Sequence, residues 1–172
     1  MRPAPDRRRQ APSIDIQVQS PLWKAEPAAA TTVRAAIAAA AVMLASPAGE
    51  VSVVLTDDSA IAKLNRDWRG IDRPTNVLAF PAQPPKASGG PRMFGDIAIA
   101  YETLARECAD ADKPFLHHLA HLVVHGFLHL MGYDHETDAD AAAMEALEGV
   151  ILARLQVADP YRARPVTSDR HA

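Results

Sequence analysis

Three histidines near residue 130 have the spacing of a metal site. His125, His129 and His135 lie at positions i, i+4 and i+10 of the segment His-Gly-Phe-Leu-His-Leu-Met-Gly-Tyr-Asp-His. Apolar residues recur at helical spacing from Pro114 to Leu130, which predicts a long helix. Side chains four residues apart share one face of a helix, so the first two imidazoles point the same way. Three imidazoles with an open fourth position are typical of catalytic rather than structural zinc.

A glycine between the second and third histidines allows the third to reach the same ion. Gly132 can adopt a conformation that other residues avoid, so we expect the helix to end there and the chain to turn back. The spacing matches the extended zinc-peptidase pattern His-Glu-x-x-His-x-x-Gly-x-x-His, except that Gly126 stands at the glutamate position. The general base of such peptidases is therefore absent. We predict one zinc ion per chain, held by His125, His129 and His135.

A second candidate site is a cluster of three arginines, Arg66, Arg69 and Arg73, in a predicted turn between a helix and a strand. Arginine keeps its charge and holds phosphate through two parallel hydrogen bonds, so the cluster is a candidate for binding a phosphate-bearing substrate. The alternative is a solvated helix end, because cations are favourable near a helix C-terminus. Composition alone does not decide between these two interpretations.

Charge and composition narrow the class of protein. The chain has 172 residues, a length that fits a single domain. Its one cysteine, Cys108, cannot form an internal disulfide, which fits a reducing compartment. No apolar run reaches the roughly 18 residues of a membrane span. Seven of the 18 basic residues lie in segments 1–9 and 162–172, and the remaining body has a net charge of about −8. We therefore expect a cytoplasmic protein with no membrane partner, which binds polyanions only through a local basic patch and does not bind DNA.

The predicted elements form one α+β domain between two flexible tails, residues 1–12 and 159–172. Within the domain, 13–158, we expect a small mixed four-stranded sheet packed with about five helices, the histidine-bearing helix at the centre. The last two strands should pair as a hairpin around a flexible loop at 84–91. Thr31 or Thr32 is a candidate cap for the first helix. The expected strands are 13–19, 50–56, 77–80 and 95–100, and the expected helices are 27–45, 57–70, 101–111, 114–130 and 137–155.

These motifs together resemble the YbeY family of bacterial rRNA maturation factors. The matching segments are the arginine-rich stretch from Asn65 to Pro81, the Gly-Asp-Ile strand at 95–97 and the histidine motif from His125 to His135. Met144-Glu-Ala-Leu-Glu148 also resembles the last helix of the family. The resemblance covers about residues 14–157 and leaves out both tails.

The resemblance implies a single-strand-specific, metal-dependent endoribonuclease. Such an enzyme would act in 3′-end maturation of small-subunit (16S) rRNA and in ribosome quality control, with RNA, the small subunit and assembly factors as partners. His125, His129 and His135 match the family's zinc ligands, and Arg69 matches its functionally important arginine. We therefore place Arg69 and His125 in the catalytic centre, and expect Arg66 and Arg73 to help bind the substrate.

Several roles stay open at this point. Proton transfer falls to the water on the metal, to Asp134 or to the RNA 2′-hydroxyl, because no glutamate follows His125. His121, one helical turn before His125, either supports that ligand from behind or has no role at the site. His117 and His118 are expected to be exposed. Two other functions remain: a zinc peptidase of the zincin type, and a metal-containing ribosome assembly factor without catalytic activity.

Overall fold

The computed structural model describes residues 11–83 and 92–161, and all structural statements below refer to them. Almost all of the predicted N-terminal tail and the whole predicted loop at 84–91 lie outside these residues, as does most of the predicted C-terminal tail. The described elements are β1 (Ser13–Val18), a 3-10 helix (Pro21–Ala25), α1 (Ala29–Met43), β2 (Glu50–Thr56), α2 (Asp58–Arg69), β3 (Val77–Pro81), β4 (Met93–Ala100), α3 (Tyr101–Ala111), α4 (Phe115–Leu130) and α5 (Asp138–Arg154).

The four strands form one mixed sheet in the order β1-β2-β4-β3. β1 pairs parallel with β2, as expected for two strands joined by a helix, and β2 pairs parallel with β4. β3 pairs antiparallel with β4, from Val77 opposite Ile99 to Pro81 opposite Gly95, which confirms the predicted hairpin. The single α+β domain with a four-stranded mixed sheet and five α-helices is thus confirmed.

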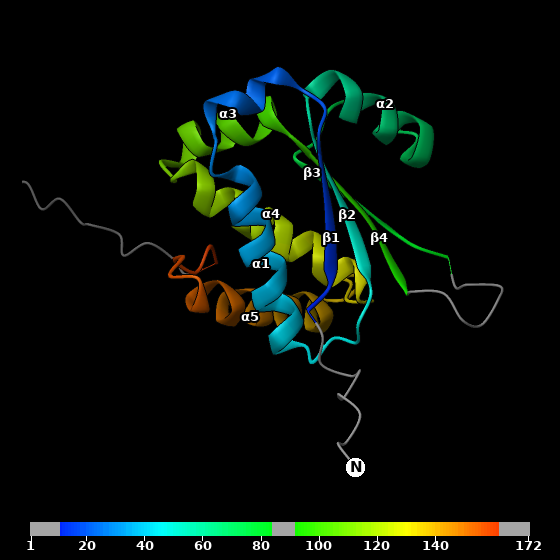
Figure 1. The fold of residues 1–172 in the computed structure, drawn as a ribbon, viewed down its shortest axis with the longest axis vertical. Coiled ribbons are helices and arrows are strands. Elements are labelled where there is room, and N and C mark those ends of the chain that lie inside the picture. Colours follow the sequence, from blue (N-terminus) through cyan, green and yellow to red (C-terminus); the bar gives the residue numbers. More distant parts are fainter. Residues whose placement is uncertain (1–10, 84–91, 162–172) are drawn as a thin grey trace, which may run out of the picture.

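Two apolar cores hold the helices on the sheet. The larger core joins α1, α3, α4 and α5 to one face, and fully buried Val33, Val53 and Phe127 belong to it. On the other face, α2 packs through Ile61 against Leu78 and two alanines of β4. Figure 1 shows α2 on its own side of the sheet, with α4 among the other helices. Because α4 touches β3, β4 and three helices, its histidines start from a rigid support.

The start of α1 differs from the prediction. The first residue of the helix is Ala29, so Thr31 and Thr32 lie inside its first turn, and the Ala28 cap has no side-chain hydrogen bond. Ala29 is only 3% exposed, and burial of this residue moves the start of the helix ahead of the threonines. The prediction of a threonine cap is wrong because packing outweighs capping preference here.

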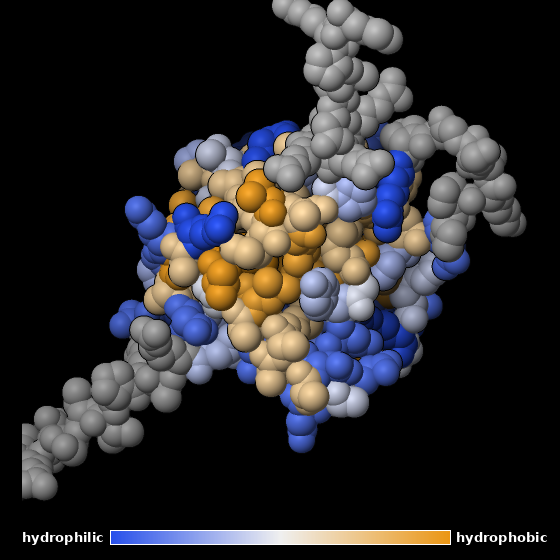
Figure 2. Space-filling model, turned by 90° about the horizontal axis from the view of Figure 1, so that it is seen from below, coloured by the Kyte–Doolittle hydropathy of each residue, from blue (hydrophilic) through white to orange (hydrophobic). Residues whose placement is uncertain are grey.

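Apolar side chains also remain on the surface. Figure 2, seen from below, shows hydrophobic residues gathered in the middle of this face, the side on which α5 and the end of α1 lie in Figure 1. Val42 of α1 is 69% exposed and Val150 of α5 is 51% exposed. Among the described residues, no helix combines the length and apolar character required to cross a membrane.

Candidate metal centre and its pocket

The three predicted histidines converge. His125 and His129 project from α4, and His135 comes from the loop after it. One nitrogen from each imidazole lies within 4.8 Å of the others, and the Nε2 atoms of His125 and His129 are 3.1 Å apart. Ligand nitrogens of a tetrahedral zinc ion with bonds of 2.0–2.1 Å lie about 3.3 Å apart. The residues present therefore fit a metal ion with three nitrogen ligands.

The loop that brings His135 to the cluster begins at Gly132. This glycine has φ +95°, a left-handed conformation that strains other residues, as the sequence predicts. The backbone N–H of Tyr133 then donates to the carbonyl of Leu128, which ties the loop to the end of α4. The Asp134 carboxylate accepts the backbone N–H of His135 at 2.8 Å. Asp134 thus shapes the loop backbone while its side chain stays exposed in the pocket.

A buried carboxylate on α5 orients His125. The Nδ1–H of His125 donates to Oε1 of Glu148 at 2.6 Å, and Glu148 is 0% exposed. This contact leaves Nε2 of His125 facing His129. Burial raises the pKa of Glu148, but hydrogen bonds from His121, His125 and Tyr161 outweigh it and hold the pKa at about 2. Glu148 is therefore ionised, and a carboxylate that holds a ligand histidine in this way raises the basicity of the imidazole.

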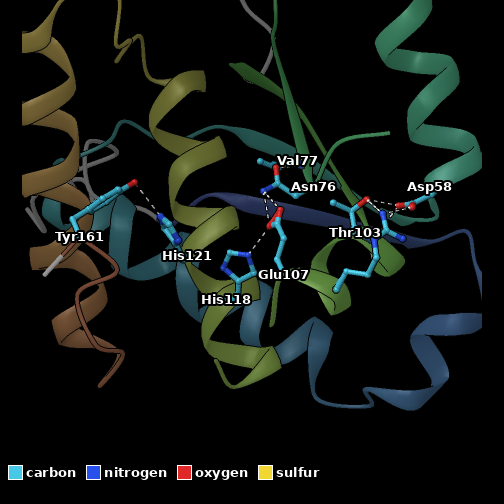
Figure 3. Close-up of polar contacts among 9 residues, drawn as sticks. Asp58, Asn76, Val77, Thr103, Glu107, His118, His121 and Tyr161 are labelled. Atoms are coloured by element: carbon cyan, nitrogen blue, oxygen red, sulfur yellow. Dashed lines mark hydrogen bonds and ion pairs between the residues drawn. The ribbon is translucent and has the colours of Figure 1, made fainter. Parts of the chain in front are cut away.

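The other oxygen of Glu148 has two partners. Its Oε2 lies 2.9 Å from Nε2 of His121 and accepts the hydroxyl of Tyr161 at 2.6 Å. His121 thus reaches the cluster through Glu148, and Figure 3 shows the rings of His121 and Tyr161 approaching each other from α4 and from beyond α5. Tyr161 falls within the predicted tail at 159–172, yet residues 159–161 are held against α5, because the Tyr161 hydroxyl binds Glu148 of that helix.

Sequence reasoning missed Glu148 and Tyr161. A signal existed for Glu148: it lies between Met144 and Ile151, which are both buried, at the i+4 position of an apolar stripe. A carboxylate on the buried face of a helix needs charged or hydrogen-bonding partners, and His121, already a candidate for supporting His125, could supply one. Tyr161 has no comparable pattern around it, because it follows the last helix in an irregular segment.

The surroundings of His129 favour its neutral form. Burial lowers the pKa of His129, and positive charge on His125 and His135 lowers it further. A metal ligand must be a neutral imidazole, so the environment of this residue favours the form that binds metal.

The histidines line an open pocket of about 520 Å³. Arg69, at the C-terminal end of α2, lies on the rim of this pocket, and β3 and the loop after α4 complete its walls. Gly126 borders the pocket, but a Cβ at this position would lie 3.1 Å from the Ile97 side chain in β4. A side chain at 126 would therefore project toward the sheet rather than toward the cluster.

The three arginines lie in different places. Arg69 borders the histidine pocket and also a second pocket, which Arg73 lines too. Arg66 forms an exposed ion pair with Asp67 at 3.5 Å.

His117 is exposed, as predicted, whereas His118 is 8% exposed and bound to Glu107 at 3.0 Å, so the expectation of exposure for His118 is wrong. An ionisable partner on α3 makes burial of this imidazole possible.

Comparisons with known proteins agree with these motifs. The family model described as Endoribonuclease YbeY matches residues 15–156. A protein of Bradyrhizobium diazoefficiens named Endoribonuclease YbeY is 54% identical over 162 residues, or 91% of this chain and 88% of that protein. The protein of the same name from Nitrobacter hamburgensis is 54% identical over 87% of this chain and 82% of its own length. A solution structure from Thermotoga maritima, TM1509, is 23% identical, with a TM-score of 0.46 over 87% of this chain and 99% of that one. The extent and identity of the sequence matches place this chain in the YbeY family of endoribonucleases.

Proposed function

We propose that this protein is a zinc-dependent endoribonuclease specific for single-stranded RNA. The observation that carries the proposal is the convergence of three imidazole nitrogens at a pocket with Arg69 on its rim. The names of the relatives supply the substrate class, because they are described as endoribonucleases. From the family resemblance we further propose that it acts in the cytoplasm on the 3′ end of 16S rRNA and in ribosome quality control, with the small subunit and assembly factors as partners.

His125, His129 and His135 would hold the zinc ion, and Glu148 would fix the orientation of His125. When bound, zinc polarises a phosphoryl oxygen or lowers the pKa of water to about 7. The guanidinium of Arg69 stabilises the negative charge that builds up on the phosphate during cleavage. The Asp134 carboxylate lines the same pocket and is the protein group placed to accept a proton.

Substrate choice provides the first test. The protein, purified without chelator and with its metal content measured, should cleave a labelled single-stranded RNA within its unstructured region. It should leave the matching RNA duplex and an unstructured peptide of similar length intact. Cleavage of the peptide but not of the RNA would show that the zincin-type peptidase is the right assignment. Bound metal with no cleavage of either substrate would favour the non-catalytic assembly factor.

The surroundings of Gly126 argue against a peptidase. Gly126→Glu restores the peptidase motif, but its carboxylate would enter the interface between α4 and β4 beside Ile97. We predict that this variant gains no peptidase activity and unfolds at a markedly lower temperature, because burying an unpaired carboxylate and overpacking a core both cost stability. Thermal unfolding followed by circular dichroism, beside a peptide-cleavage assay, checks this. Gly126→Ala is the control, since one methyl group requires only a small shift of Ile97. A stable Gly126→Glu protein that cleaves peptides would contradict the assignment.

A further inference from the structure

A second pocket, named here the side pocket, lies on the other side of Arg69 from the histidine cluster. It has a volume of about 430 Å³ and is formed by the end of α2, the turn at 71–76 and the exposed side of α3. Arg69 borders both pockets, so the two are adjacent. A chain-like substrate whose reacting bond lies at the histidines would continue into this side pocket as it passes Arg69.

The positive charge in the side pocket is available to a ligand. Within residues 11–83 and 92–161, neither Arg69 nor Arg73 forms an ion pair with a carboxylate. The backbone at Arg73 is held in place, because Asn65, only 3% exposed, donates its amide N–H to the carbonyl of Arg73 at 2.9 Å. Two unpaired guanidinium groups on a supported turn are suited to a phosphate group.

The opposite wall of the side pocket presents a hydrogen-bond acceptor. The Glu107 carboxylate accepts the amide of Asn76 at 2.8 and 3.0 Å, and its Oε2 lies 3.0 Å from Nε2 of His118. Figure 3 shows Glu107 reaching from α3 to a position between these two residues. A carboxylate has about four lone-pair positions, so these contacts leave it able to accept one more hydrogen bond. The wall is thus fixed in place and accepts a donor group.

We propose that the side pocket binds the nucleotide next to the cleaved bond in single-stranded RNA. Arg73, together with Arg69, contacts the phosphate of this nucleotide, and Glu107 accepts a hydrogen bond from its ribose 2′-hydroxyl or from an exocyclic amine of its base. An anionic ligand with donor groups matches a pocket that is cationic on one wall and carboxylate on the other. The inference rests on the proposed function and adds to it the path that the RNA follows, from the metal pocket across Arg69 toward α3.

Neutral phosphate analogues test this contact directly. RNA oligonucleotides with a single uncharged methylphosphonate at each linkage flanking the cleavage site would be measured for binding by fluorescence anisotropy. Wild-type protein, Arg73→Ala and Lys63→Ala would be compared, since Lys63→Ala removes an exposed cation from α2 away from both pockets. Unmodified RNA should bind Arg73→Ala about tenfold more weakly than wild type, with a smaller salt dependence, and Lys63→Ala within about twofold of wild type.

At one linkage, the loss of phosphate charge should affect wild type but not Arg73→Ala. Neutralisation of this linkage should weaken binding to wild type about tenfold and leave binding to Arg73→Ala unchanged, because the contact is already lost. A 2′-deoxy substitution and removal of the exocyclic amine at that nucleotide would be tested separately. The change that weakens binding identifies the group that donates a hydrogen bond to Glu107. Additive losses at every linkage, or equal losses for Lys63→Ala, would overturn the side-pocket assignment. Failure of wild type to cleave unmodified RNA would instead overturn the proposed function, since binding is measured separately from cleavage.

Discussion

Arg69→Ala is expected to cleave single-stranded RNA about a hundredfold or more slowly than wild type, with its zinc content unchanged. The guanidinium lies at the rim of the histidine pocket, where charge would build up on the phosphate. Loss of one group that stabilises such charge costs about 10²–10³ in turnover. Arg69 is exposed at the C-terminal end of α2, so its removal should lower the free energy of unfolding by less than about 1 kcal/mol.

The measurements belong on one preparation: zinc content, thermal unfolding and the kinetics of RNA cleavage. A contact made in the transition state lowers kcat, whereas a contact that only positions the substrate raises KM. Arg69→Lys keeps the charge but loses the two-pronged donor geometry, so it should also be impaired. Full activity in Arg69→Ala would refute the role, and loss of activity together with unfolding would make Arg69 a structural residue.

Glu148→Gln is expected to lower the affinity for zinc about 10–100-fold, as is typical when a carboxylate behind a ligand histidine is replaced. The substitution keeps the size of the side chain but removes its charge. The two carboxylate oxygens of Glu148 accept hydrogen bonds from His121, His125 and Tyr161. The substitution replaces one of these oxygens with an NH2 group, which cannot accept a hydrogen bond. His125 would then lose the partner that keeps its proton on Nδ1 and leaves Nε2 free for a metal.

Competition with a zinc chelator of known affinity measures this effect without relying on enzyme activity. Asp140→Asn is the matched control, because Asp140 is an exposed carboxylate of the same helix that does not line the pockets at the histidines. Thermal unfolding of both variants separates a local change at His125 from loss of the fold. Equal zinc affinities for wild type and a folded Glu148→Gln protein would mean that Glu148 does not support the metal site.

The convergence of the three histidines could be predicted from the sequence because its determinants are local. Helical periodicity gives the shared face of His125 and His129, and a single left-handed glycine brings His135 back to them. The pairing of β3 with β4 as a hairpin was likewise accessible, since consecutive strands tend to lie side by side. Each of these features depends on residues within one or two adjacent elements.

The supporting contacts could not be predicted in the same way. The bond between His125 and Glu148 joins residues 23 apart, and the contact between Asn76 and Glu107 joins residues 31 apart. The first depends on how α5 packs against α4 and the second on how α3 lies against the turn before β3, and spacing in the sequence does not contain this information. The burial of His118 follows from the same packing, because Glu107 comes from a different helix.

The most direct test of the account is a titration of RNA cleavage against bound zinc. Protein of known metal content would be loaded stepwise with zinc, and cleavage of a defined single-stranded 16S rRNA precursor fragment would be followed at each step. We expect the rate to rise in proportion to bound zinc and to reach a plateau at one ion per chain, with His129→Ala neither retaining the ion nor cleaving. A cleavage rate that does not depend on bound zinc, or an intact fragment at one zinc per chain, would contradict it.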